Sequence, residues 1–154
     1  MEHCKAEKMS ATTKNKKENS VSASHAKCLL CGNRNPYSLH LNFVKTEVDG
    51  EVQAFFQPQS MMQGYPEILH GGVVAALLDA AMTNCLFQQG IKALTGELQV
   101  RFLKPLDCNT RLQIKAQLKE SYDPLFLLQS QIIVNGQIYA KAKAKFLRCK
   151  GDLI

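Results

Sequence analysis

The sequence predicts an α+β domain in which one long antiparallel sheet wraps around a central apolar helix. Three observations lead to this prediction. Residues 73–87 are apolar on almost every helical face, which is typical of a buried helix rather than a surface one. Two runs before this helix and four after it have the pattern of half-buried strands. No internal repeat is apparent, so one sheet packed on one helix accounts for the whole order.

The central helix is predicted over residues 73–87, and Gly90 follows it at the position of a left-handed C-cap. The run is too short and too interrupted by polar residues to cross a bilayer, which needs about 20 apolar residues. We therefore expect no membrane segment. Asp79 is the only charged residue inside the helix. Its neighbours one turn away provide no polar face around it: Ala75, Ala76, Met82 and Thr83.

Asp79 has two interpretations. An acid in apolar surroundings can be paired with a neighbouring backbone group or can reach a wet edge. Alternatively, it is a partly desolvated carboxylate retained for chemistry, because perturbed acids gather at functional sites. Gly71 and Gly72 favour the second interpretation. Their N–H groups lie at the positive end of the helix without side-chain cover, which creates a site for an anion or an oxyanion.

Gly71 and Asp79 are too far apart to contact the same carbonyl group. Eight residues of helix separate them, or about 12 Å at 1.5 Å per residue. If both act on one substrate, they come from different copies of the helix. The sequence therefore predicts self-association as a dimer or tetramer with a shared site. Pairing of sheet edges between subunits would also protect those edges.

The strands are expected to form two groups. Residues 39–48 and 51–57 precede the helix, and Asp49-Gly50 between them favours a tight hairpin. Residues 58–69 are predicted to be a loop. In the first strand after the helix, apolar residues from Leu94 to Phe102 alternate strictly with polar ones, including Thr95 and Glu97. The four strands after the helix are predicted over residues 94–102, 111–118, 125–134 and 138–146.

Residues 1–27 are predicted to be a flexible basic tail, and residues 28–154 to form the folded domain. The formal charge of the 154-residue chain is +6, and the tail, with six Lys and three Glu, accounts for half of it. A basic charge concentrated in a tail is weak support for nucleic-acid binding, so we expect no nucleic-acid partner. The 45% of hydrophobic residues is ample for one core.

The six cysteines are expected to be reduced thiols in a cytoplasmic protein, because the N-terminus lacks the apolar stretch of a secretory signal. Cys28 and Cys31 form a Cys-x-x-Cys pair, which is half of a zinc site. His25 and His40 are the nearby residues that could complete it. A redox pair is a second alternative, although no strand precedes the motif. On ligand count we expect no metal and no other cofactor, and instead a compact turn before Asn35-Pro36.

Three stretches of the chain carry a family resemblance: Gly64 to Ala81, with Asp79 nine residues after His70; the Cys28-x-x-Cys31-Gly32 and Asn35-Pro36 pattern; and Thr95 followed by residues 100–105. Together they resemble the PaaI-like acyl-CoA thioesterases, which have the hotdog fold. The similarity extends over about residues 28–148 and implies that fold, an acyl-CoA substrate and hydrolysis of its thioester bond.

The resemblance implies a role for several residues. Asp79 would be the nucleophile or the general base that activates water. The Gly71 N–H of the partner subunit would polarise the thioester carbonyl, and Thr95 would assist the water. Many relatives carry an Asn six residues before the His, where this chain has Gly64. The adjacent Gln63 could substitute for that Asn, and Glu67 adds a second carboxylate in the same loop.

Further candidates have less specific roles. His70 could orient the loop before the helix or act as a general base. Arg101 belongs to a set of basic residues on strands, some of which could hold the phosphates of coenzyme A. The remaining candidates for substrate binding lie beside the His-Gly-Gly motif: Gly72, Glu67 and Tyr65.

The implied chemistry is coherent on physical grounds. A thioester carbonyl develops negative charge when attacked, and each preorganised backbone donor contributes about 3–4 kcal/mol there. A carboxylate in apolar surroundings is a better base than one in water. Two alternatives remain open. One is a non-catalytic acyl-CoA-binding hotdog protein; the other is a hotdog enoyl-CoA hydratase or dehydratase, which would need a His paired with an acid, and only His70 could serve.

Overall fold

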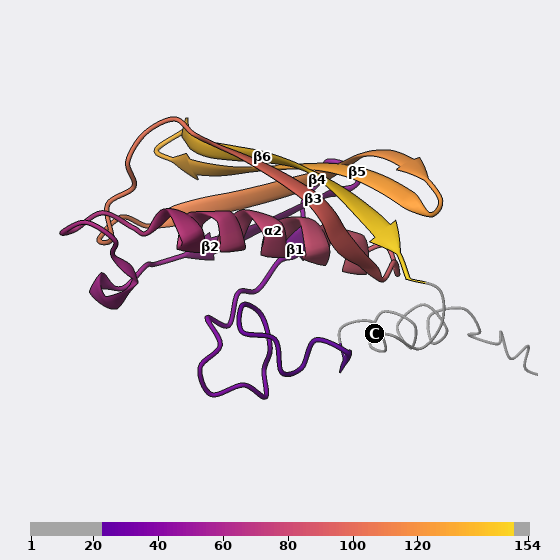
Figure 1. The fold of residues 1–154 in the computed structure, drawn as a ribbon, viewed down its shortest axis with the longest axis horizontal. Helices are drawn as coiled ribbons and strands as arrows, with labels where there is room; N and C mark the ends of the chain where they lie inside the picture. The colour runs from indigo at the N-terminus through magenta and orange to yellow at the C-terminus, as the bar shows by residue number, and fades with distance from the viewer. Residues whose placement is uncertain (1–22, 150–154) are drawn as a thin grey trace, which may run out of the picture.

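The structure, a computed structural model, describes residues 23–149, and in this range a six-stranded antiparallel sheet curves around one long helix (Figure 1). The strand order is β1-β2-β4-β5-β6-β3, so β1 and β3 are the edges. The elements are β1 (Val44–Lys45), β2 (Glu51–Phe56), the 3₁₀ turn η1 (Ser60–Met62), α2 (Gly71–Phe87), β3 (Ala93–Phe102), β4 (Leu112–Tyr122), β5 (Leu125–Val134) and β6 (Gln137–Arg148). This is the predicted architecture.

The core lies between α2 and the concave face of the sheet, where α2 packs against every strand from β2 to β6. Leu77, Leu78 and Met82 on the helix are completely buried. Alanines at alternate positions of β6 face the helix and let the two backbones approach closely: Ala140, Ala142 and Ala144. The helix is therefore held by apolar burial, as its sequence indicated.

α2 begins at Gly71, where the sequence placed the positive end of the helix, and ends at Phe87; Gly90, at the predicted C-cap, has a φ of +72°. The expectation that the helix is buried on all sides is wrong for the single chain. Asp79 lies on a half-buried stripe at helical spacing, because the sheet covers only the opposite side of α2. The other members of this stripe are Ala75, Ala76 and Thr83. Asp79 therefore reaches a partly solvated edge of the core.

The first predicted strand, residues 39–48, shortens to the two residues of β1. Leu41 and Phe43 are buried, with 6% and 5% of their surfaces exposed, but they belong to a loop. The N–H groups of Leu39 and Leu41 donate to the carbonyls of Leu29 and Leu30 instead of joining the sheet. The apolar pattern of residues 39–48 therefore reflects burial of Leu41 and Phe43 against the core, not a strand along the whole segment.

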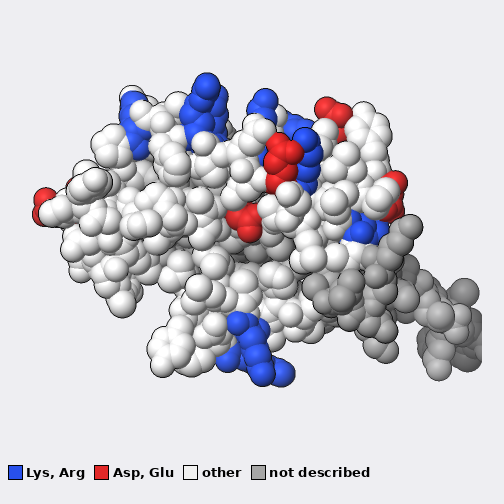
Figure 2. Space-filling model, viewed as in Figure 1, with Lys and Arg blue, Asp and Glu red and all other residues white. Residues whose placement is uncertain are grey.

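The predicted tail, residues 1–27, lies mostly outside the described residues. Within the described part, the ring of His25 already packs edge-on against Phe87, the last residue of α2. Lys and Arg side chains gather over the outer face of the sheet, away from α2 (Figure 2). Among residues 23–149 no helix has the length and apolar character needed to span a membrane.

Candidate active site

Asp79 contacts Thr95 across the interface between α2 and the edge strand β3. The Thr95 hydroxyl donates a hydrogen bond of 2.7 Å to Oδ1 of Asp79. Burial raises the pKa of the Asp79 carboxyl above its ordinary value, and the hydrogen bond from Thr95 offsets part of that rise. The structure thus brings together two residues that were predicted to act together, and it keeps the carboxylate partly desolvated.

A β-bulge at Gly96 positions Thr95. Thr95 is opposite the buried Phe146, whereas Glu97 is opposite Lys145 and forms a 2.6 Å ion pair with it on the outer face. In a regular strand Thr95 and Glu97 would share one face, as the alternation predicted. The extra residue in the bulge turns Thr95 toward α2 instead. Bulges of this kind often re-aim a side chain beside an active site.

The N-terminus of α2 is capped by His70. Nδ1 of His70 accepts a 2.9 Å hydrogen bond from the N–H of Gly72, and the His70 carbonyl accepts from the N–H groups of Val73 and Val74. A Cβ at Gly72 would lie 3.0 Å from His70 Nδ1 and would crowd this cap. The Gly72 N–H is therefore bonded within the chain and is not available to a substrate. The same hydrogen bond fixes the orientation of the His70 ring.

The N–H of Gly71 remains available. It has no hydrogen-bond partner among residues 23–149, and Gly71 is exposed. A Cβ at this position would meet only the Phe102 ring, at 3.6 Å. Gly71 thus presents a free donor at the positive end of a 17-residue helix. Sequence reasoning did not identify Phe102 as a neighbour of this donor, although its apolar position near the end of β3 is the signal that could have found it.

An apolar hollow of about 280 Å³ opens beside Gly71. Ile68, Phe102 and Leu103 contribute to its wall, and each of them is exposed by 38–56%. Large apolar side chains left open around a polar donor indicate a surface that another group covers.

The loop before α2 is held by its own hydrogen bonds. Gln63 Oε1 accepts from the Glu67 N–H at 2.9 Å, and the Glu67 carbonyl accepts from the Cys108 N–H. The Leu69 N–H donates to the Leu106 carbonyl. Gln63 and Glu67 therefore brace the loop that precedes Gly71, and Tyr65 projects from it with 79% of its surface exposed.

The predicted site residues fall into two groups within one chain. Asp79 and Thr95 form one group at the middle of α2. The second group surrounds the helix N-terminus and contains Gln63, Tyr65, Glu67, His70, Gly71 and Gly72. The helical rise separates Gly71 from Asp79 by about 12 Å, so a single chain does not bring the two groups together.

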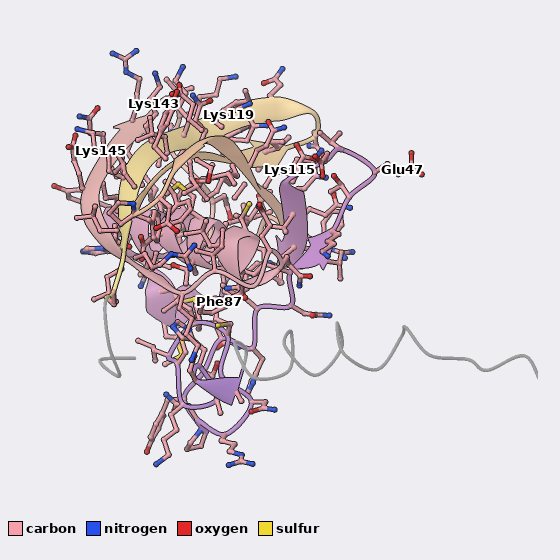
Figure 3. The ribbon with its side chains drawn as sticks, turned by 90° about the vertical axis from the view of Figure 1, so that its right-hand side faces the viewer. Glu47, Phe87, Lys115, Lys119, Lys143 and Lys145 are labelled. Carbon is pink, nitrogen blue, oxygen red and sulfur yellow. The ribbon has the colours of Figure 1, made fainter. Side chains whose placement is uncertain are left out.

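Arg101 lies apart from both groups. It is opposite Lys141 in the register of β3 and β6, and both line a groove of about 600 Å³ on the outer face of the sheet. Lys119 and Lys143 of this groove point away from α2 (Figure 3). A phosphate held by Arg101 would therefore lie on the opposite face of the sheet from the Asp79 carboxylate.

Comparison with known proteins gives the fold a family context. Residues 67–121 match the thioesterase superfamily. Acyl-coenzyme A thioesterase THEM4 of Mus musculus is 25% identical over 104 residues, which are 66% of this chain and 45% of that protein. The chain thus spans about half the length of the curated relatives it matches.

Solved structures share the same architecture. The Escherichia coli PaaI protein from the phenylacetic acid degradation operon superimposes with a TM-score of 0.73 at 18% identity, covering 88% of this chain and 98% of that one. A Streptococcus mutans protein bound to acetyl CoA gives a TM-score of 0.66 at 19% identity, covering 71% and 88%. The match of residues 67–121 is thus to the thioesterase superfamily, and the sheet and helix around them have the hotdog fold of these solved structures.

Proposed function

We propose that the protein hydrolyses the thioester bond of an acyl-CoA in a site shared by two subunits. The observation that carries the proposal is the pairing of a partly desolvated Asp79 with Thr95 on a helix whose first N–H, that of Gly71, is free. The match of residues 67–121 to the thioesterase superfamily and the acyl-CoA thioesterase names of the curated relatives support this reaction class.

In the proposed reaction, Asp79 acts as a general base and removes a proton from water. The water oxygen bonds to the thioester carbonyl carbon, and the negative charge that develops on the carbonyl oxygen is stabilised by the Gly71 N–H of the other subunit. The tetrahedral intermediate then collapses, the carbon–sulfur bond breaks, and the sulfur leaves as the thiol after taking up the proton that Asp79 removed from water. Thr95 orients the carboxylate and keeps it ionised through its hydrogen bond.

The sheet edge at β3 supports the dimer. Among the strands of residues 23–149, β3 pairs only with β6, so it is a ten-residue edge strand. Leu94 and Phe102 on it are 50% and 56% exposed. A long uncovered edge with apolar side chains is a site for pairing with another strand. Two-fold pairing of β3 with its copy would run the two sheets together and bring each Asp79 toward the partner helix.

The acyl group is proposed to be apolar. The hollow beside Gly71 is lined by Ile68, Phe102 and Leu103 with few polar atoms, so it suits a hydrocarbon chain attached to the carbonyl that Gly71 polarises. Coenzyme A as the carrier is supported by the acetyl CoA bound to the Streptococcus mutans neighbour.

The hydratase alternative receives less support from the geometry. It requires a His that exchanges protons with substrate, whereas the His70 side chain accepts from Gly72 at the helix cap. A non-catalytic acyl-CoA-binding protein is the remaining alternative, and it is an outcome of the test below.

The direct test incubates the purified protein with a panel of acyl-CoAs and detects the released thiol. The wild type should hydrolyse at least one member, and Asp79→Asn should lower kcat by about 10²-fold or more because it lacks the base. Asp49→Asn is the matched control: Asp49 is an exposed turn residue, and Asn-Gly suits the same hairpin. Binding without hydrolysis by the wild type would favour the non-catalytic alternative, and equal activity of Asp79→Asn and Asp49→Asn would reject Asp79 as the base.

A single-turnover reaction in ¹⁸O-labelled water separates the general base from a nucleophile. A general base leaves the label in the released fatty acid and none in the protein. A nucleophilic Asp79 would form an anhydride, and attack of water on the aspartyl carbonyl of this anhydride would place the label in the Asp79 carboxylate, so label in the protein identifies the nucleophile.

A further inference from the structure

Three side chains that commonly bind metals meet beside the C-terminal end of α2. They are His25, Cys28 and Cys31, and their ligand atoms all lie within 4.8 Å of one another. Nδ1 of His25 and Sγ of Cys31 are 3.7 Å apart. The sequence showed only two clustered ligands, Cys28 and Cys31, with His25 and His40 as nearby candidates. The fold adds His25 as a third.

We propose that His25, Cys28 and Cys31 bind one zinc ion, with solvent in the fourth position. Zinc binds His nitrogen at about 2.0–2.1 Å and Cys sulfur at about 2.3 Å in a tetrahedral arrangement, which places these two ligand atoms about 3.6 Å apart. The 3.7 Å between Nδ1 of His25 and Sγ of Cys31 matches that separation. Two thiolates and one imidazole form a soft ligand set that favours zinc over magnesium or calcium.

The turn that carries both cysteines is built tightly. The Leu30 N–H donates to Cys28 Sγ at 3.3 Å, and a donor directed at sulfur stabilises the negative charge of a thiolate ligand. The Gly32 N–H donates to the Cys28 carbonyl. A Cβ on Gly32 would lie only 2.5–2.6 Å from backbone atoms of Ala26 and Cys28, so only glycine fits there. This turn keeps the two sulfurs close together.

His25 is oriented by α2. Its ring packs edge-on against the Phe87 ring, with centroids 4.6 Å apart and planes at 78°. The labelled Phe87 lies where the end of α2 meets the N-terminal segment in Figure 3. The ion would therefore hold His25 in the position where its ring packs against the end of α2. Phe87 is 16 residues from Gly71 and eight from Asp79 along the helix, or about 24 Å and about 12 Å. The zinc site is therefore separate from the proposed active site and does not depend on its chemistry.

The test measures how much zinc the full-length chain binds. The protein is reduced, incubated with zinc and passed through a desalting column that removes unbound metal. Elemental analysis should give one zinc per wild-type chain. Cys28→Ser and Cys31→Ser should each lose it, and His25→Ala should weaken zinc affinity by at least about 100-fold, since even changes to residues behind the ligands cost 10–100-fold. Cys149→Ser is the matched control and should keep the full amount, because Cys149 is not part of the cluster.

Cobalt provides a second readout. Bound in place of zinc, it should show thiolate charge-transfer absorption and the visible bands of a tetrahedral site in the wild type and in Cys149→Ser only. A chelator should lower the Tm of these two proteins and leave Cys28→Ser and Cys31→Ser unchanged. Circular dichroism verifies that the variants are folded.

Two results would overturn the proposal. One is a reduced wild type that takes up no stoichiometric zinc and shows no cobalt absorption, as expected if Cys28 and Cys31 are only a redox pair. The other is zinc that is kept by Cys28→Ser and Cys31→Ser, which would place the ion elsewhere.

Discussion

The Thr95 hydroxyl donates a 2.7 Å hydrogen bond to the Asp79 carboxylate, joining the middle of the central helix to the edge strand of the sheet. Two opposing effects meet at this carboxylate. Burial favours its neutral form and raises its pKa, while the hydrogen bond favours its charged form. Thr95 therefore controls how much of Asp79 is available as a base at a given pH.

Replacing Thr95 by Val should shift the acid limb of the pH–rate profile to higher pH. Val has the same shape but cannot donate, so the pKa of Asp79 rises further and the base is lost at a higher pH. Thr95→Ser keeps the donor and should restore the wild-type limb. The measurement is kcat/KM against pH for the three proteins with one acyl-CoA. Coincident acid limbs for Thr95→Val and the wild type would show that the hydrogen bond does not tune Asp79.

Asp79→Asn should increase stability at neutral pH. The pKa of Asp79 is raised in the folded state, so its contribution to stability is fully present below its usual value of 3.8 and is lost as pH rises through the folded-state pKa. Asn carries no charge and still accepts from Thr95. The stability difference between variant and wild type should thus be largest near pH 7 and vanish below pH 3.8.

Urea unfolding at several pH values measures this difference, and Asp49→Asn serves as the control without a pH-dependent gain. A difference with the opposite pH dependence would mean that the Asp79 charge stabilises the fold.

His70→Ala should destabilise the fold by about 0.5–2 kcal/mol, because the Gly72 N–H loses its capping acceptor. His70→Asn supplies another good cap and should restore most of this loss. Denaturant unfolding measures both. The same pair tests the role in hydrolysis: capping predicts that the Asn variant is more active than the Ala variant. Equal, severe loss of kcat in both would instead identify His70 as a general base.

Ala142→Leu should destabilise the protein by about 1–3 kcal/mol, because Ala142 is 3% exposed and faces α2, where added methyl groups overpack the core. Its neighbour Lys143 points to the outer face, so Lys143→Leu should change the unfolding free energy by about 0.5 kcal/mol or less. Thermal and urea unfolding check the pair. Equal effects would contradict the assignment of faces in β6.

The features best predicted from sequence are those set by local chemistry. Gly50 and Gly90 have positive φ, as their turn and cap positions required. The buried helix and the strands after it followed from periodicity, because burial of one face imposes a period on the chain.

What the sequence did not reveal depends on contacts across the fold. The alternation through Leu41 and Phe43 looked like a strand, but their segment bonds to the turn near Leu29. The bulge at Gly96 reverses the face of Thr95, although the apolar–polar alternation of the sequence continues through it. A glycine inside a strand is a signal for such a bulge. His25 was assigned to the flexible tail, because the sequence around it does not show that Phe87 lies beside it in the fold.

The central claim is that Gly71 and Asp79 act in one site but come from different subunits. Gly71→Val should block approach of the carbonyl to the helix N-terminus, and its Cβ meets only the Phe102 ring at 3.6 Å, so the subunit can still fold. Asp79→Asn removes the base. Each variant alone should be almost inactive.

The decisive measurement mixes the two inactive variants under conditions of subunit exchange, with heterodimers verified by mass spectrometry of differently tagged chains. In a heterodimer one site carries both lesions and the other carries neither. Activity should therefore return in half of the sites of each heterodimer, or about a quarter of all sites in an equal mixture. Verified exchange without any return of hydrolysis would contradict the shared site.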